Sequence, residues 1–478
     1  MSSIAAGTAR PAPNRDALIA VGFGVGAVVF GAMVATRPIL AVGIPVLLGA
    51  AMLAWWAPAA NFTLLVFLTA IVPYGIQNSY DIGGGAGSPG LLASDIVLLL
   101  GMVRAVVSLS DMVLDRRAKI AIAALVGFAV LGGLQAVHGY LEGRSLSEIG
   151  AEYRVFVVLV GAALMALPLL LDPGGRRNLM RGMLFLGLLL GLWAGIQWTV
   201  DIPFAAAGDA GVREGILQTT EGRGQIQGGL FSFPVATILA AAALISGGIR
   251  SRLGVAAAVV VLLLNLGGLL LTYERTFWVT TALGLLLVIA MSTGRARLRA
   301  LIWVPLALVA FFAVMSTIAP ETLGAARERL LSLGRYQSDN SLRYRLVESR
   351  HVIDEIEKAP VFGSGLAAEI YWGRAWEQVP PESHTFAHNG YLWVTWKAGL
   401  VGALLLFGAL LFVLIGRAPP EPSPLLRTLR TGAKAALLAL LLSSVTFPSF
   451  TQLSSAAVIG MLAAWAVAPL TTARRRSA

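Results

Sequence analysis

Runs of 18 or more predominantly apolar residues recur along the whole 478-residue chain. As a helix, such a run crosses the hydrocarbon core of a bilayer, which is about 30 Å thick. Apolar residues make up 57% of the chain and charged residues only 13%, whereas about one quarter of a soluble domain is charged. The sequence therefore predicts an all-α fold, a polytopic transmembrane bundle of about 12 to 14 helices.

The longest polar connection, residues 319–387, divides the chain. We expect an N-terminal transmembrane bundle at 1–318, this loop with an amphipathic helix, and C-terminal transmembrane helices at 388–478. The polar start MSSIAAGTARPAPNRD leads into an apolar run without a cleavage site, so the first helix is expected to stay as an anchor. The predicted spans are 17–36, 39–56, 60–76, 91–109, 120–139, 155–171, 182–200, 229–247, 254–272, 277–291, 300–318, 388–416, 433–449 and 452–470.

Lysine and arginine gather in alternate connections between these spans, which is the pattern of short cytoplasmic loops. Both termini are therefore predicted in the cytoplasm and residues 319–387 on the outer face of the membrane, which is the periplasmic face of the inner membrane if the source is a Gram-negative bacterium. Cytoplasmic arginines explain the net charge of +11 without a nucleic-acid partner. The basic residues concerned are Arg116, Arg117, Lys119, Arg176, Arg177, Arg181, Arg250, Arg252, Arg295, Arg297, Arg299, Arg427, Arg430, Lys434, Arg474, Arg475 and Arg476.

Several kinds of chemistry have no sequence signal. The chain has no cysteine, and HExxH, Walker and Asp-x-Asp patterns are missing. No metal and no cofactor are therefore expected, and the substrate must reach the protein already activated. A lipid diphosphate-linked sugar meets that need. Its anionic leaving group calls for arginines, its acceptor hydroxyl for a base, and its tail for a groove between helices.

The stretch HTFAHNGYLWVTWKAGLVG, residues 384–402, supplies the candidate base. Histidine can take a proton from a hydroxyl, so His388 is the predicted catalytic residue. The alternative is an interfacial aromatic belt with an incidental histidine. A lysine as deep in the span as Lys397 must pair, snorkel or face a cavity. The residues predicted to bind the sugar or acceptor are Asn389, Tyr391, His384 and Trp372, with Trp376 and Trp393 as further stacking faces.

The long loop contains a predicted helix, NSLRYRLVESRHVIDEIEK, with a cap at Asn340 or Ser341 and Pro360 after its end. Its apolar stripe predicts a helix on the membrane surface. Arg343 and Arg350 are seven residues apart, share a face, and form a predicted clamp for a diphosphate. The alternative is contact with lipid headgroups. The stripe consists of Leu342, Leu346, Ile353 and Ile356.

Three other arginines at predicted outer ends are candidates for the diphosphate site. Arg275 stands in the short connection LTYERTFW, Arg223 in the Gly-rich TTEGRGQIQGG, and Arg154 at the start of a span. Each by itself is explained as an interfacial anchor, whereas several around one outer cavity would indicate an anion site. Glycines such as Gly187 and Gly191, inside apolar spans, are explained by close helix packing.

In order along the chain, these features resemble the O-antigen ligase and O-antigen polymerase superfamily. Arg275 stands in a tight outer turn, and Pro360, Gly363 and Gly365 match a Pro-x-x-Gly-x-Gly stretch. The sequence from His388 then matches a His-Asn, nine residues, Gly-x-x-Gly pattern, which ends at Gly402. The chain departs from the family at Lys397, where related proteins often have an acidic residue.

The resemblance implies metal-independent transfer of a glycan from undecaprenyl diphosphate on the periplasmic face. It assigns the base to His388 and the diphosphate to Arg275 and Arg223. The acceptor is lipid A–core in a ligase of lipopolysaccharide synthesis, a second lipid-linked glycan in an O-antigen or exopolysaccharide polymerase, or a protein hydroxyl; we favour the ligase. The rival class is a flippase or transporter, which calls for charges deep in several spans and broken helices. The main charges inside spans are Asp95, Arg104 and Lys397.

Overall fold

The computed structural model describes residues 48–72, 90–200, 229–247, 249, 251–292, 294–331, 340–374, 379–416 and 423–468. Residues from Ala54 onward form one compact unit, to which the description below refers. Its elements, in chain order, are α3 (Pro58–Val66), the π-helix η1 (Phe67–Ile71), α5 (Ala93–Ser110), α6 (Arg116–Leu141), α7 (Leu146–Leu171), α8 (Pro173–Val200), α10 (Ser232–Ser246), α11 (Arg252–Leu271), α12 (Arg275–Met291), α13 (Gly294–Ile318), α14 (Pro320–Leu331), α15 (Asn340–Lys358), β1 (Ile370–Arg374), β2 (Val379–His384), α16 (Gly390–Ile415), α17 (Pro424–Ser443) and α18 (Leu453–Val467).

The helices confirm the predicted all-α polytopic class. Among the described residues, 7 helices are long and apolar enough to cross a membrane, or 8 if the bent pair Leu48–Trp56 and Pro58–Ile71 forms one span. The 7 are α5, α6, α7, α8, α11, α13 and α16, and the shorter α10, α12 and α18 are also apolar. The predicted span at 17–36 lies outside the described residues, so the total of about 12 to 14 spans stays a prediction.

The predicted span at 433–449 is displaced. α17 begins at Pro424, with Ser423 as its N-cap, and ends at Ser443. Proline at the first helical position and a serine cap are typical helix starts. Arg427, Arg430 and Lys434 therefore lie within the first eleven residues of a helix, although the sequence predicted them in a loop. After Ser443 the chain turns through a connection that contains Pro448 and enters α18 at Leu453.

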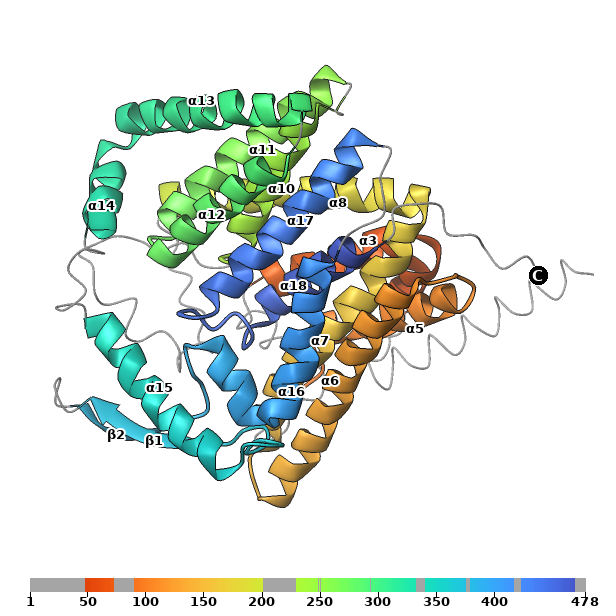
Figure 1. Ribbon diagram of the computed structural model, residues 1–478, viewed down its shortest axis with the longest axis vertical. Helices are drawn as coiled ribbons and strands as arrows, with labels where there is room; N and C mark the ends of the chain where they lie inside the picture. Colours follow the sequence, from red (N-terminus) through yellow and green to blue (C-terminus); the bar gives the residue numbers. More distant parts are fainter. Residues whose placement is uncertain are drawn as a thin grey trace, which may run out of the picture. The chain divides into compact units, whose positions relative to one another are not determined.

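α7 forms the centre of the bundle. Of its most apolar window, 89% is buried, against 11% for α13, whose side chains face outward. α7 packs against α18, α5, α6 and α8, while α10, α11, α12 and α17 pack together as a second group (Figure 1). Gly187 and Gly191 of α8 face Val261 and Leu264 of α11, which confirms that they serve close helix contact.

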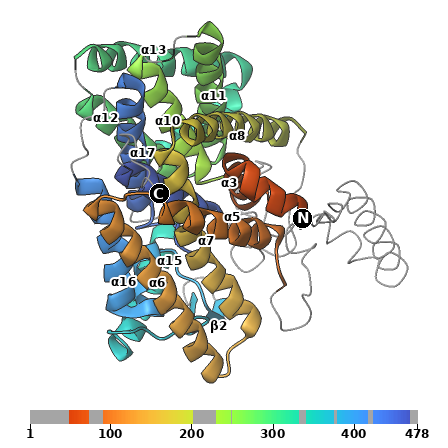
Figure 2. The same cartoon turned by 90° about the vertical axis from the view of Figure 1, so that its right-hand side faces the viewer.

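α6 and α16 run side by side in opposite directions (Figures 1 and 2). At the end where α16 finishes, basic side chains bind the free carbonyls of helix C-termini. Lys434 donates to the carbonyls of Leu414 and Gly416 at 3.0 and 2.7 Å, and Arg430 donates to the carbonyl of Ala468. Cations are favoured there by the helix dipole. We call this the capped end.

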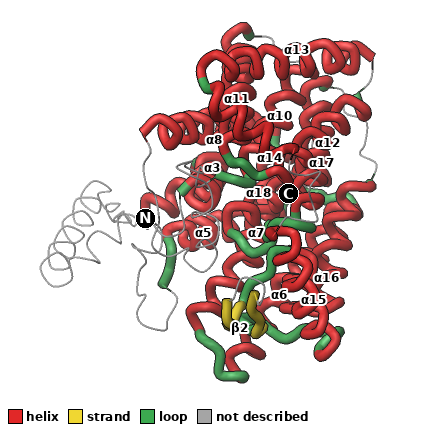
Figure 3. Tube along the Cα trace, turned by 90° about the vertical axis from the view of Figure 1, so that its left-hand side faces the viewer, coloured by secondary structure: helices red, strands yellow, loops and turns green. Residues whose placement is uncertain are grey.

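The opposite end of the α6–α16 pair carries the long connection. Here α15 and the antiparallel hairpin of β1 and β2 lie beside the first part of α16 (Figures 1 and 3). The sequence predicted the helix but not the hairpin. β2 begins Val379-Pro380-Pro381, and a proline cannot donate to a ladder, which is tolerated in a sheet of only two edge strands.

Candidate active site

α16 is interrupted at Gly399, whose φ of 68° and ψ of −176° are not helical. A break frees backbone groups on both sides, and inside a membrane these must find partners within the protein. Residues 360–368, which we call the clamp segment, lie against the break and supply them. The hydrogen bonds run from Ser364 N to Trp396 O (2.8 Å), Gly365 N to Lys397 O (3.2 Å), Leu400 N to Pro360 O (2.8 Å) and Val401 N to Val361 O (3.2 Å).

The glycines of the two resemblance motifs make this contact possible. Gly363 and Gly365 have φ angles of 80° and 84°, in the region that favours glycine. A Cβ on Gly363 would lie 2.5 Å from the amide nitrogen of Gly399, and one on Gly399 would press into the carbonyl oxygen of Val361. The Pro-x-x-Gly-x-Gly and Gly-x-x-Gly patterns therefore occur together because they form one backbone contact.

Glu348 of α15 holds His388 where the chain enters α16. Its Oε2 accepts the backbone N–H of His388 at 2.7 Å, and its Oε1 lies 3.0 Å from His388 Nδ1. Glu348 is 1% exposed, and the side chain of His388 is 17% exposed. A carboxylate can only accept hydrogen bonds, so the hydrogen is assigned to Nδ1 and Nε2 is left as the acceptor. This is the arrangement that a general base requires.

Aromatic rings surround the Glu348–His388 pair. Tyr344 packs edge-on against His388 and Trp372, with ring centroids 5.3 and 4.7 Å apart. The buried Trp372 stacks on His351 at 6.1 Å and meets His384 at 5.3 Å. Two of the four histidines in the chain thus contact Trp372, and a third, His388, contacts Tyr344 beside it. Together they form a wall built from α15, the hairpin and the start of α16.

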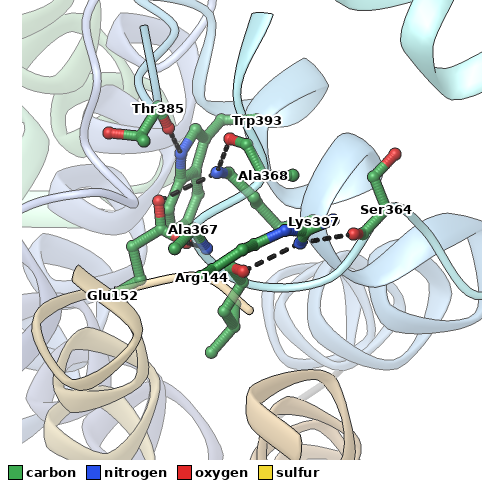
Figure 4. Close-up of polar contacts among 9 residues, drawn as sticks. Arg144, Glu152, Ser364, Ala367, Ala368, Thr385, Trp393 and Lys397 are labelled. Carbon is green, nitrogen blue, oxygen red and sulfur yellow. Dashed lines mark hydrogen bonds and ion pairs between the residues drawn. The ribbon is translucent and has the colours of Figure 1, made fainter. Parts of the chain in front are cut away.

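Lys397 forms a buried ion pair with Glu152 of α7 (Figure 4). Its Nζ lies 2.9 Å from Glu152 Oε1 and donates to the carbonyl of Ala368 at 2.6 Å. The other oxygen of Glu152 accepts the amide of Ala367 at 2.7 Å. The Lys397 side chain is fully buried and also lies over the ring of Trp396. The predicted need of this lysine for a partner is therefore met by Glu152 and the clamp segment.

Arg144 adds a third contact to the clamp segment from the connection between α6 and α7. Its guanidinium donates to the carbonyls of Ser364 and Leu366 at 2.7 and 2.9 Å (Figure 4). The amide of Leu366 in turn donates to the carbonyl of Gln135 in α6, at 3.3 Å. The clamp segment is thus held by α6, α7 and α16 together.

Arg275 lies at the same end of the bundle as the predicted base. It begins α12, and the next residue, Thr276, shares a hydroxyl hydrogen bond with Thr446 at 3.0 Å. Thr446 belongs to the connection between α17 and α18, where the carbonyl of Ser444 accepts the amide of Gly390 at 2.8 Å. Gly390 is the first residue of α16. Arg275 therefore keeps its place as a candidate for the diphosphate.

The other predicted arginines lie in different surroundings. Nε of Arg154 is 3.0 Å from Asp95 of α5, and its guanidinium also donates to the carbonyl of Gly90. Arg154 thus joins two helices, and its proposed contact with a diphosphate stays a prediction. Arg223 lies outside the described residues, as does Trp376.

The helical geometry of α15 places Arg343 and Arg350, the predicted diphosphate-binding pair, away from the predicted base His388. At about 100° per residue, Arg343 and Arg350 point about 140° and 160° away from Glu348. Both side chains are exposed. Their role in binding a diphosphate stays a prediction, and any ligand bound to them would lie on the far side of α15 from His388. Arg345, three residues before Glu348 and half-buried, is the arginine on the Glu348 side.

The residues beside His388 that are predicted to bind a sugar also have structural roles. Oδ1 of Asn389 caps α16 by accepting the amides of Tyr391 and Leu392 at 3.0 and 3.1 Å. The hydroxyl of Tyr391 donates to the carbonyl of Leu441 in α17, at 2.8 Å. Contact of Asn389, Tyr391, His384 or Trp372 with a sugar stays a prediction.

Two acidic residues, Glu348 and Glu152, escaped the sequence analysis. Each is the partner of a basic residue that the sequence did single out, and each lies on a helix distant in sequence from that partner. Among the described residues, no group of three or more histidine, cysteine or acidic side chains is arranged to hold a metal ion.

Comparison with known proteins tests the resemblance directly. Residues 258–407 match the family described as O-antigen ligase. Over these residues the match confirms the resemblance to the O-antigen ligase superfamily. The matched segment runs from α11 into α16, and so contains Arg275, Glu348, the clamp segment and His388. No curated protein matches the chain. The match supports an O-antigen ligase-like membrane glycosyltransferase in general terms.

Proposed function

We propose that this protein transfers a glycan from undecaprenyl diphosphate to an acceptor hydroxyl, at the end of the bundle that holds His388. The observation that supports the proposal most strongly is the buried Glu348 carboxylate at Nδ1 of His388, within a segment that matches the O-antigen ligase family. Following the distribution of basic residues, we place this end on the periplasmic face of the inner membrane.

The chemistry needs one base and a stabilised leaving group. Nε2 of His388 takes the proton of the acceptor hydroxyl while that oxygen attacks the anomeric carbon. The bond from this carbon to the diphosphate oxygen breaks, and undecaprenyl diphosphate leaves with the electron pair. Glu348 holds the ring in one tautomer and stabilises the imidazolium that forms.

The leaving diphosphate calls for guanidinium groups, which bind phosphate oxygens through paired hydrogen bonds. Arg275, at the start of α12, and Arg345, on the Glu348 side of α15, are the described arginines that suit this role. Arg223 remains a candidate for binding the diphosphate because of the resemblance to the O-antigen ligase family. No metal is needed for this step because cationic side chains offset the charge.

We propose lipid A–core as the acceptor, which makes the protein a ligase. A polymerase would use a second lipid-linked glycan, and a protein-glycosylating transferase would use a protein hydroxyl. The test is purified protein in lipid with a defined undecaprenyl-diphosphate oligosaccharide and the three acceptors in competition. Preferential transfer to lipid A–core supports a ligase. Preferential transfer to the second lipid-linked glycan or to the protein hydroxyl would instead indicate a polymerase or a protein-glycosylating transferase.

The same assay tests the base. His388→Ala is expected to lower the rate about 10²- to 10⁴-fold with the protein still inserted in the membrane. The matched control is His138→Ala, since His138 lies at the same end with its side chain 45% exposed and its ring contacts Gln135 and Glu142, outside the proposed site. Full activity of His388→Ala would refute the proposal.

The break in α16 at Gly399 is relevant to the alternative function, that of a flippase or transporter. In a transporter, a break near the membrane midplane lines a cavity for the transported substrate. Here the clamp segment fills the break and binds its free backbone groups. A flippase would move the lipid-linked glycan across vesicles without a transfer product, and His388→Ala would leave that movement unchanged.

A further inference from the structure

Glu152 and Lys397 have no part in the proposed chemistry, yet they form a buried ion pair within a membrane-spanning region. Burying two charges is costly unless their remaining hydrogen bonds are satisfied. Both partners meet that condition through the clamp segment, since Glu152 accepts the amide of Ala367 and Lys397 donates to the carbonyl of Ala368 (Figure 4). The pair therefore binds α7, α16 and the clamp segment at one point.

The clamp segment connects the two parts of the wall around His388. It follows the end of α15 at Lys358 and leads into β1 at Ile370. α15 carries Glu348, and β1 carries Trp372, which contacts Tyr344 and His384. Because the segment is short, its position limits where α15 and the hairpin can lie relative to α16.

We propose that Glu152 and Lys397 are positioning residues: their ion pair fixes the clamp segment and thereby holds Glu348 against His388. This inference rests on the proposed function of His388. Neither residue touches the reacting atoms, so their loss lowers the rate by displacing Glu348. A displacement of about 1 Å can cost about 10²-fold in rate even when a mutation lies away from the chemistry.

The position of α15 can be measured without any activity. The chain has no cysteine, so cysteines introduced for Asp354 on α15 and Leu404 on α16 carry two spin labels without background. Both side chains are exposed, and neither belongs to the proposed site. Pulsed electron resonance then gives the distribution of distances between α15 and α16.

We expect one narrow distribution in the otherwise unchanged protein and a broadened or shifted one in Glu152→Gln and Lys397→Met. In the transfer assay, these variants should lose about 100-fold in kcat with less than about twofold change in KM for the donor. Lys434→Gln, which removes a lysine contact at the capped end, is the control and should change neither the distances nor kcat.

Arg144→Gln provides a second variant outside the buried pair, in case removing one buried charge prevents insertion. It loses the bonds to the carbonyls of Ser364 and Leu366, and should broaden the distribution. Arg144→Lys keeps a donor and should restore part of the narrow distribution and of kcat.

An unchanged distance distribution in Glu152→Gln, Lys397→Met and Arg144→Gln overturns the inference, whatever the transfer rates. An increase in donor KM with constant kcat also overturns it, because that result assigns the pair to substrate binding. If His388→Ala keeps its activity, the proposed function fails instead, and the distances still report whether the pair positions α15.

Discussion

Lys434 and Arg430 bind the carbonyls at which α16 and α18 end, whereas Lys397 and Arg144, toward the other end of α16 and α6, bind a separate segment of the chain. At the capped end, a cation completes a helix that is already formed. At the other end, which we call the site end, cations fix the clamp segment that joins α15 to the hairpin. The same residue types thus serve stability at one end and, in our proposal, catalytic geometry at the other.

The comparison predicts different consequences for mutations at the two ends. Removing a contact at the capped end should lower stability and leave the rate of the remaining folded protein unchanged. Removing a polar side-chain contact of the ion pair or of Glu348 at the site end should lower the rate of protein that is still folded, whereas changing the backbone contact at Gly399 or the helix cap at Asn389 should lower stability. Each mutation below is paired with a control variant or is measured for both stability and rate, so that the two effects can be separated.

The largest effect is expected for Glu348→Gln. The amide cannot stabilise an imidazolium as a carboxylate does, so kcat should fall about 10²- to 10⁴-fold. The control is Glu355→Gln on the same helix, where the glutamate pairs with Lys358 at the surface. Initial transfer rates at saturating donor measure the effect. Equal rates for the two variants would show that the buried Glu348 has no greater role in the reaction than the half-buried Glu355.

Gly399→Ala should come next, through the fold. The new Cβ meets the Val361 carbonyl at a backbone φ of 68°, and such strain costs about 2–3 kcal/mol. Gly408→Ala, later in α16, meets only a Leu404 methyl carbon at 3.7 Å, and should be neutral or slightly stabilising. Thermal unfolding in detergent compares them. Equal unfolding midpoints for Gly399→Ala and Gly408→Ala would show that the clamp segment moves to accommodate the alanine side chain without a loss of stability.

Lys434→Gln tests the capped end. It removes a charged donor to two carbonyls at the end of α16, which is worth about 1–2 kcal/mol. The unfolding midpoint should fall while the rate per folded molecule stays within about twofold, since no substrate contact is involved. A loss of rate with an unchanged midpoint would contradict the separation of the two ends.

The smallest effect is expected at Asn389, where capping and sugar binding make different predictions. Asn389→Ala should lose about 1 kcal/mol of helix stability. Asn389→Ser keeps an oxygen that can cap α16, so it should recover most of that stability and most of the rate. If serine restores the unfolding midpoint but not the rate, the amide of Asn389 has a role beyond the cap.

The sequence alone was sufficient to predict where most helices lie and in what order the motifs follow one another. Long apolar runs located most described spans, because a bilayer fixes both the length and the character of a spanning helix. α7 and α8 begin nine residues before the predicted spans at 155–171 and 182–200 but end at or next to the predicted residue, whereas both ends of α17 are displaced. α17 was misplaced because its first eleven residues carry Arg427, Arg430 and Lys434, a pattern that resembles a cytoplasmic loop. The structure shows that Arg430 and Lys434 bind the carbonyls at the ends of α18 and α16.

Long-range partners could not be read from the sequence. Nothing in the local pattern pairs Glu152 with Lys397 or Glu348 with His388, since each pair joins separate helices. The predicted apolar stripe of α15, whose place on a membrane surface stays a prediction, did not indicate which side of the helix packs against the protein. Leu346 and Ile353 are 57% and 42% exposed, while Glu348 is buried, because α15 packs through Tyr344 against the hairpin, which was not predicted.

The most direct test of the central claim, that Glu348 acts through His388, is a double-mutant cycle on kcat with Glu348→Gln, His388→Ala and both together. Residues that act as one unit are strongly non-additive. We predict that the double variant loses no more than His388→Ala alone. A double variant whose loss equals the product of the two single losses would contradict the account, because Glu348 and His388 would then act independently.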